Sequence, residues 1–222
     1  MSSCHDSGPR TTVRRLPQRA VYDRTVIDQI LDEGLVCDVG IVEDQQPIII
    51  PMAYVRIDDQ IVVHGAKASR LLRTLARGVV ACIAVTLLDG LVLARSAFHH
   101  SMNYRSVVLF GTGAAIEVPQ DKLEALRLLT ERLTPGRWPT IRRPSERELQ
   151  QTLVVAVSIR EASAKIRTGP PLDEEGDYAL PIWAGVLPLH LASSNPIPDP
   201  CLKAGIPLPE HVAHWRESNG EG

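Results

Sequence analysis

Residues 35–65 decide the fold, and they read LVCDVGIVEDQQPIIIPMAYVRIDDQIVVHG. Three runs rich in β-branched residues, 35–42, 47–57 and 61–65, are separated by the polar segments EDQQ (43–46) and DDQ (58–60). β-Branched residues favour extended backbone, and short polar links of this kind join neighbouring antiparallel strands. The stretch therefore predicts three strands that pair antiparallel in the order of the sequence.

Further strand signals follow on the C-terminal side. Runs 79–88 and 91–97 flank Asp89-Gly90, a dipeptide typical of a two-residue hairpin turn, while 104–118 and 153–159 each read as one strand. The links stay short and polar, and helices are expected at only four places. This pattern favours an antiparallel barrel or sandwich over a parallel α/β sheet, so the expected fold class is mainly β.

The four helices have recognisable starts or stops. Asp23 can cap a helix with one apolar face, and Gly34 is expected to end that helix in a left-handed conformation. Residues 67–76 are expected to be helical. Pro119 opens a leucine-rich helix, and SERE (145–148) matches a capping box.

Composition divides the chain into three segments. Residues 1–22 carry several arginines and few large apolar side chains, which is typical of an arm. Residues 23–168 hold the predicted helices and strands and form the expected domain. Residues 169–222 are rich in proline, so we expect them to wrap the surface of the same domain.

Composition also excludes several classes of function. The net charge of 24 − 26 = −2 argues against nucleic acid as a partner, because such binding depends on neutralising phosphates. The longest apolar run, 79–88, is about half the roughly 20 residues that a membrane helix needs. Residues 1–19 lack the apolar stretch of a secretory signal, so we expect a cytoplasmic protein.

No metal site is expected. The four cysteines include no C-x-x-C pair, so they predict neither a disulfide framework nor a zinc site. The neighbouring His99 and His100 cannot readily share one ion if they lie in a strand, because adjacent strand residues point to opposite faces.

The window HGAKASRLLR (64–73) places cations where a strand is expected to turn into a helix. Lys67 and Arg70 would lie in the first turn, where the positive end of the helix dipole disfavours them unless an anion is bound. A phosphate there could accept hydrogen bonds from the backbone, from the Ser69 hydroxyl and from both cations. On this window alone, an exposed and solvated helix face is the preferred interpretation.

Several further motifs occur in an order that resembles a known family. They are PIIIPMAY (47–54), IVVHGAK (61–67), SAFHHSMNYRSVVLFG (96–111), SAKIRTGP (163–170) and IWAGVLPL (182–189). Together they resemble the FMN-binding split β-barrel superfamily of pyridoxamine 5′-phosphate oxidase, in the branch related to nitroimidazole-resistance proteins. The resemblance covers residues 20 to 200.

The resemblance implies a six-stranded antiparallel split β-barrel with peripheral helices, and a homodimer that binds FMN at the subunit interface. Lys67, Ser69 and Arg70 would hold the FMN phosphate. The backbone of Ile50, Pro51, Met52 and Ala53, together with His64 and Gly65, would run along the isoalloxazine ring and the ribityl chain. Ser106, with Arg105 beside it, would lie where the oxidases contact the flavin ring, and Trp183 would approach from the C-terminal segment.

The same resemblance implies an oxidoreductase that uses FMN to pass electrons from a reduced donor to a small organic acceptor, with nitroaromatic compounds as one class. The alternatives are an FMN carrier or sensor without turnover, and the same barrel binding haem or a deazaflavin. The oxidases' C-terminal Arg-rich clamp for pyridoxal phosphate has no counterpart in HVAHWRE (211–217), so vitamin B6 is not the expected substrate.

Overall fold

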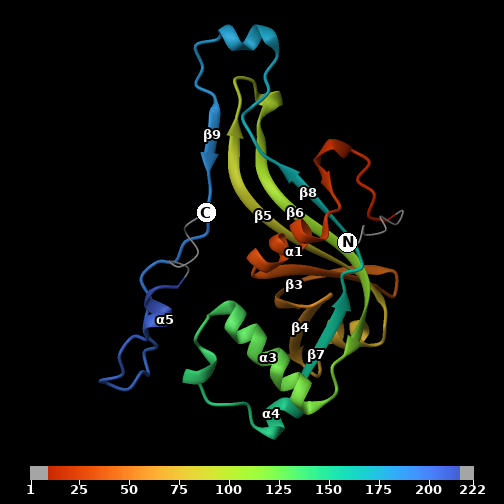
Figure 1. The fold of residues 1–222 in the computed structure, drawn as a ribbon, viewed down its shortest axis with the longest axis vertical. Helices are drawn as coiled ribbons and strands as arrows, with labels where there is room; N and C mark the ends of the chain where they lie inside the picture. The colour runs from red at the N-terminus through yellow and green to blue at the C-terminus, as the bar shows by residue number, and fades with distance from the viewer. Residues whose placement is uncertain (1–9, 216–222) are drawn as a thin grey trace.

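The computed structural model describes residues 10–215, and in this part of the chain six strands close into a barrel (Figure 1). The strands are β1 (Ala20–Val21), β2 (Val36–Glu43), β3 (Gln46–Ile57), β4 (Gln60–Ala66), β5 (Val80–Leu93), β6 (Ser101–Ala115), β7 (Thr152–Ser158), β8 (Glu161–Arg167) and β9 (Gly185–Pro188). The α-helices are α1 (Arg24–Glu33), α2 (Arg70–Ala76), α3 (Pro119–Leu133), α4 (Glu146–Gln151) and α5 (Glu210–Ala213).

The ring of the barrel runs β6–β7–β4–β3–β2–β5 and closes where β5 pairs with β6. Every pairing in it is antiparallel, so the predicted six-stranded split barrel is confirmed. The core inside the ring is aliphatic, and α1 and α2 contribute side chains to it, among them Ile30 and Leu72. Helix α3 covers a second, smaller apolar cluster on the outer side of β3, β4 and β7.

The β5–β6 hairpin is longer than the barrel and projects from it as an arm (Figure 1). Only residues 82–84 of β5 pair with β2, whereas residues 90–93 pair with β9. On β6, residues 113–115 pair with β7 and residues 104–110 with β8. One half of the hairpin therefore belongs to the barrel, and the other half carries β8 and β9 on its edges.

The hairpin turn predicted at Asp89-Gly90 is wrong. These residues lie inside β5, at a β-bulge where the pairing register shifts between Leu88 and Gly90. Pairing to β6 on one edge and to β9 on the other keeps this backbone extended, and the Asp89 carbonyl accepts a hydrogen bond of 3.0 Å from the Leu189 amide. Long-range pairing thus overrides the local turn preference, and the connection to β6 lies at residues 94–100.

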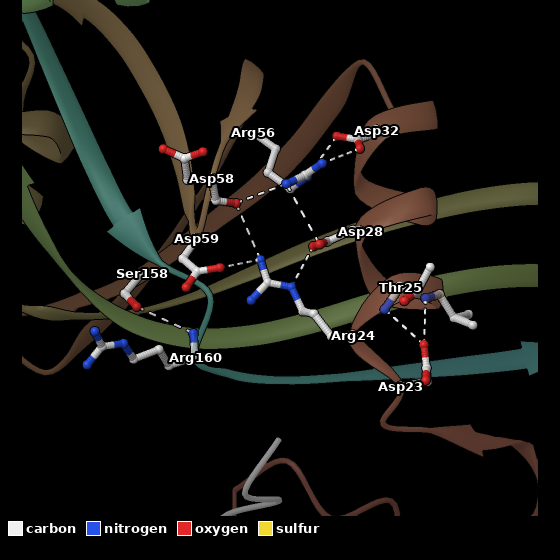
Figure 2. Close-up of polar contacts among 11 residues, drawn as sticks. Asp23, Arg24, Thr25, Asp28, Asp32, Arg56, Asp58, Asp59, Ser158 and Arg160 are labelled. Atoms are coloured by element: carbon white, nitrogen blue, oxygen red, sulfur yellow. Dashed lines mark hydrogen bonds and ion pairs between the residues drawn. The ribbon is translucent and has the colours of Figure 1, made fainter. Parts of the chain in front are cut away.

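Helix α1 is held against the β3–β4 hairpin by a network of charges (Figure 2). Its predicted cap is confirmed, since Asp23 Oδ1 accepts hydrogen bonds from the backbone amides of the first turn at 2.9 and 3.2 Å. Arg24 binds Asp28 at 2.6 Å and Asp59 at 3.0 Å, and Arg56 on β3 binds Asp32 at 2.5 Å. The network joins the helix to β3 and to the turn between β3 and β4.

The left-handed stop predicted at Gly34 is also wrong. Its φ is −66° and its ψ 144°, which is extended backbone that any residue can adopt. Glycine is needed there for space, because a Cβ would lie 2.6 Å from Val85 Cγ1 and 2.7 Å from the Tyr54 hydroxyl. The Tyr54 hydroxyl is buried and donates a hydrogen bond of 2.5 Å to the Leu31 carbonyl. Tyr54 and Val85 are both buried, so neither side chain can move to make room for a Cβ without losing packing.

The other helix signals are confirmed with one shift in a boundary. Both halves of the capping box at Ser145 and Glu148 are present, and α3 begins at Pro119. Helix α2 begins at Arg70 rather than at 67, because Ser69 is its N-cap and its hydroxyl accepts a hydrogen bond from the Leu72 amide.

The N-terminal part of the described chain pairs with the barrel, whereas much of the C-terminal part is exposed. Near the N-terminus, Arg10 binds Glu161 at 2.7 Å and β1 pairs with β8, a strand that the sequence did not predict. Near the other end, β9 was also not predicted, and every residue from 187 to 208 is exposed. We call residues 189–208 the strap. Residues 1–9 of the expected arm and 216–222 of the expected wrap lie outside the described residues.

Candidate functional site

The predicted site residues fall into two groups, and the first lies on β3, at the end of β4 and at the start of α2. Strand pairing puts Pro51 opposite Asp38 and Ala53 opposite Val36, on the outer face of the sheet. Ile50 and Met52 alternate with them on the opposite face, where Met52 packs against the core. The expected segment 50–53 therefore offers only alternate side chains to a ligand outside the barrel.

The end of β4 is tightly packed against α2. A Cβ on Gly65 would lie 2.9 Å from Leu72 Cδ1, so this glycine allows the close approach of strand and helix. Next to it, His64 is half-buried, and desolvation by burial lowers its pKa. Its Nδ1 is buried and has no hydrogen-bond partner among residues 10–215.

The three residues expected to bind phosphate form an exposed polar corner. Lys67 is exposed and has no ion-pair partner in the described part of the chain, and its amide donates a hydrogen bond of 2.8 Å to the Gln151 carbonyl. Arg70 Nε lies 3.2 Å from Glu43 Oε2, and the Arg70 side chain is 72% exposed. The exposed pair is weak, so Arg70 can turn to an added anion at small cost.

Glu43 belongs to this corner, although the sequence pattern gave no sign of it. It ends β2, and one of its carboxylate oxygens accepts a hydrogen bond of 2.6 Å from the Thr74 hydroxyl. The same oxygen lies 3.5 Å from Arg77 Nη2 at the other end of α2. Only the closure of the barrel brings residue 43 to this helix, so the local sequence carries no signal for the contact.

The second group of predicted residues lies on the arm. Ser106 is on the outer face of β6 and donates a hydrogen bond of 3.3 Å to the Lys165 carbonyl. Arg105 points to the other side, where it binds Asp89 and Glu33. Trp183 precedes β9, is 69% exposed and packs its ring against Gly185.

One chain does not bring the two groups together. Pairing places Pro51, Asp38, Ala84 and Val108 in one row across β3, β2, β5 and β6. Three strand spacings of roughly 4.8 Å put Pro51 and Val108 about 14 Å apart across the sheet. The two groups are therefore separate places on the surface of one chain.

The outer face between the two groups is apolar. Its exposed large apolar side chains are Val36, Val42, Ile49, Val80 and Leu88, with exposed fractions from 43% to 69%. Asp38 is the charged residue in the row that crosses this face. A contiguous apolar patch of this kind marks a surface that another molecule covers.

The comparisons with known proteins identify the family. Residues 23–166, which are more than half of the chain, match the family model described as pyridoxamine 5′-phosphate oxidase. The chain belongs to the pyridoxamine 5′-phosphate oxidase family. Members of this family with solved structures include two that are similar over nearly their whole length. No curated protein matches the chain.

The first of these structures is the flavocytochrome Anf3 from Azotobacter vinelandii, which is 40% identical, covers 95% of this chain and 98% of its own, and superposes with a TM-score of 0.88. The second is an FAD- and haem-binding protein from Mycobacterium smegmatis, at 38% identity, 88% and 96% coverage and a TM-score of 0.83. A candidate 5-nitroimidazole antibiotic resistance protein from Bacteroides thetaiotaomicron, at 22% identity, 66% and 86% coverage and a TM-score of 0.56, shares the fold.

The described residues contain neither a cluster of metal ligands nor a membrane-spanning helix. No group of three or more His, Cys, Asp or Glu side chains within residues 10–215 is placed to hold a metal ion. Over the same residues, no helix combines the length and the apolar character that crossing a membrane requires.

Proposed function

We propose that this protein binds a flavin and a haem and works as an oxidoreductase in the cytoplasm. The observation that carries the proposal is the 40% identity over 95% of the chain to a flavocytochrome, together with the 38% identity to a protein described as binding FAD and haem. FMN is the flavin expected from the sequence. The second relative favours FAD, so the identity of the flavin is one readout of the test.

The flavin phosphate is proposed to bind at Lys67, Ser69 and Arg70. Lys67 is unpaired among the described residues, and Arg70 holds only an exposed ion pair. Two cations can both donate charge-assisted hydrogen bonds to a phosphate or diphosphate. Such a group carries more negative charge than the single Glu43 carboxylate that now lies beside Arg70. Pro51, Ala53 and His64 lie next along the same face and are proposed to contact the rest of the flavin.

The protein is proposed to act as a homodimer whose second copy completes the site. The strap carries exposed Leu191 and Ile197, at 62% and 93%, and it has no strand neighbour among residues 10–215. At its start the Leu189 amide donates a hydrogen bond to the Asp89 carbonyl, and beyond its other end Trp215 Nε1 donates to the Leu133 carbonyl at 2.8 Å. Extended chain with exposed apolar side chains is stabilised when a partner surface covers it.

The apolar outer face of the sheet offers such a surface. It lies between the two groups of site residues, so a second copy seated there would bring its own arm toward the β3–β4 corner of the first. Arg105, Ser106 and Trp183 of one copy would then approach Lys67 and its neighbours in the other. This arrangement accounts for the division of the predicted site into two separate groups.

The chemistry belongs mainly to the cofactors: a bound flavin supplies hydride and single-electron transfer, and a haem supplies single-electron steps. The chain's own residues bind and orient these groups and exclude water from them. The electron acceptor is proposed to be a small organic molecule, with nitroaromatic compounds as the class to test first.

The experiment is to purify the protein, record its absorption spectrum and identify the extracted cofactors by mass spectrometry. We expect flavin bands and a Soret band, reduction by NADH or NADPH without oxygen, and reoxidation by a nitroaromatic compound. A flavin that no donor reduces would contradict the enzyme proposal and leave a carrier. A protein that binds neither FMN, FAD nor haemin when loaded would contradict the proposed function as a whole.

A further inference from the structure

We propose that the protein binds a small organic carboxylate in a cleft between the C-terminal end of α3 and the C-terminal segment of the chain. The cleft has a volume of about 380 Å³, and its lining residues are Leu133, Thr134, Arg137, Ser193, Val212 and Trp215. Cavities of about 300 Å³ or more are large enough for a small ligand. None of these six residues belongs to the predicted flavin site, so the inference goes beyond the proposed function and does not depend on it.

One side of the cleft is apolar and has a fixed orientation. It is formed by Leu133, Val212 and Trp215. The Trp215 indole nitrogen donates a hydrogen bond of 2.8 Å to the Leu133 carbonyl, which uses this donor and orients the ring. The indole therefore offers a ligand its apolar ring surface. A flat aromatic or hydrocarbon body suits this side of the cleft.

The polar side of the cleft contains a positive charge without a counter-charge. The Arg137 side chain is half-buried and forms neither a hydrogen bond nor an ion pair within residues 10–215. A guanidinium keeps its proton at neutral pH, so this charge is permanent. The neighbouring Thr134 hydroxyl likewise has no hydrogen-bond partner in that part of the chain. Arg137 and Thr134 can therefore donate together to the two oxygens of a carboxylate.

The turn that carries Arg137 is held in place by Glu131. The carboxylate oxygens of Glu131 accept hydrogen bonds from the amides of Gly136 and Trp138, at 2.8 and 2.6 Å. The bond from Gly136 above all lowers the pKa of Glu131, so this carboxylate stays ionised. Gly136 also has a positive φ of 80°, a conformation that favours glycine. The backbone on both sides of Arg137 is thus fixed, while its guanidinium is available to a ligand.

The lining also selects the charge and the size of the ligand. None of the six lining residues is Asp or Glu, so a cation would find no counter-charge among them. One guanidinium balances one negative charge, which suits a carboxylate better than a doubly charged phosphate. Ser193 donates its hydroxyl proton to the Trp215 carbonyl at 3.3 Å, so towards a ligand it can only accept a hydrogen bond. A small monocarboxylic acid with an aromatic or hydrocarbon body meets these conditions.

The test titrates the purified full chain with benzoate and with benzamide, which share a ring and a size but differ in charge. Binding is followed by NMR through the indole N–H signal of Trp215, one of three tryptophans in the chain. We expect benzoate to shift this signal and to bind at least about tenfold more tightly than benzamide. In Arg137→Gln, benzoate should bind only as tightly as benzamide. Unchanged affinity for benzamide in that variant shows that the cleft is intact.

Two control variants separate the cleft from other cationic sites. Arg142→Gln removes an exposed arginine that already pairs with Glu148, and it should keep the wild-type preference for benzoate. The double variant Lys67→Ala and Arg70→Ala lacks the cations of the proposed flavin site, and it should bind benzoate like the wild type.

The proposal is overturned if the wild type binds benzoate no better than benzamide, or if Arg137→Gln keeps the preference for benzoate. Loss of benzoate binding in the Lys67→Ala and Arg70→Ala variant would also overturn it, because the probe would then occupy the flavin site. None of these measurements needs a bound flavin or haem. Failure of the cleft and failure of the proposed function are therefore distinguishable.

Discussion

Arg105 on β6 donates two hydrogen bonds, of 2.7 and 3.0 Å, to the carboxylate of Asp89, the residue at the bulge of β5. The same guanidinium also binds Glu33 at the end of α1. These bonds raise the pKa of Arg105 above its ordinary value, first through Asp89 and then through Glu33, so the side chain stays charged. Arg105 therefore ties the bulge in the arm to α1, whatever it contacts in a dimer.

Replacing Arg105 by Met should lower the free energy of unfolding by about 1–2 kcal/mol, because two carboxylates lose their shared partner while the apolar stem is kept. Urea denaturation measures the change. The matched control is Arg127→Met, which removes an exposed pair with Glu124 within α3 and should change the free energy of unfolding much less. Equal losses of unfolding free energy in the two variants would show that Arg105 does not tie the bulge of β5 to α1.

The double substitution Lys67→Ala and Arg70→Ala should weaken flavin binding at least about tenfold, since two cations no longer meet the phosphate. Fluorescence titration of the apoprotein with FMN and with FAD measures this. Arg77→Ala is the control, because Arg77 also contacts Glu43 from α2 but lies at the far end of the helix. Unchanged affinity in the double variant, or an equal loss in Arg77→Ala, would place the phosphate elsewhere.

His64 should make the stability of the protein depend on pH. Burial lowers its pKa, so the folded state takes up a proton less readily than the unfolded state, whose pKa is about 6.5. The stability linked to the neutral ring is complete above about pH 6.5 and falls as the pH drops toward the folded pKa. The free energy of unfolding should therefore decline less between about pH 7.5 and about pH 5.5 in His64→Gln than in the wild type. An identical decline would show that the ring is not desolvated.

Substituting Leu191 and Ile197 together by Asp should raise the dissociation constant of the dimer at least about tenfold, because both side chains would be charged where the partner covers the strap. Sedimentation velocity over a range of concentrations measures it. Lys203→Asp changes the charge of the same exposed segment without removing an apolar group, and it should have a smaller effect. If the wild-type chain sediments as a monomer throughout, the dimer proposal fails.

Local signals in the sequence were sufficient for most elements of the barrel. The turn at Asp44 and Gln45 has positive φ values of 49° and 64°, which joins β2 to β3 as its polar residues predict. The caps at Asp23 and Ser145 likewise depend on residues within three positions. Each of these features is decided by neighbours in the chain.

The wrong predictions concern residues whose conformation depends on distant partners. Asp89 is held extended by β6 and β9, and Gly34 is required by the side chains of Tyr54 and Val85. The candidate site shows the same limit. Motifs predicted its residues, but their division between the β3–β4 corner and the arm follows from the ring closure, which no local pattern encodes.

Native mass spectrometry of the purified protein, recorded before and after incubation with FMN, FAD and haemin, tests the central proposal most directly. The account predicts a complex of two chains that carries one flavin and one haem for each chain. Single chains without any bound cofactor, found even after incubation with all three compounds, would contradict it.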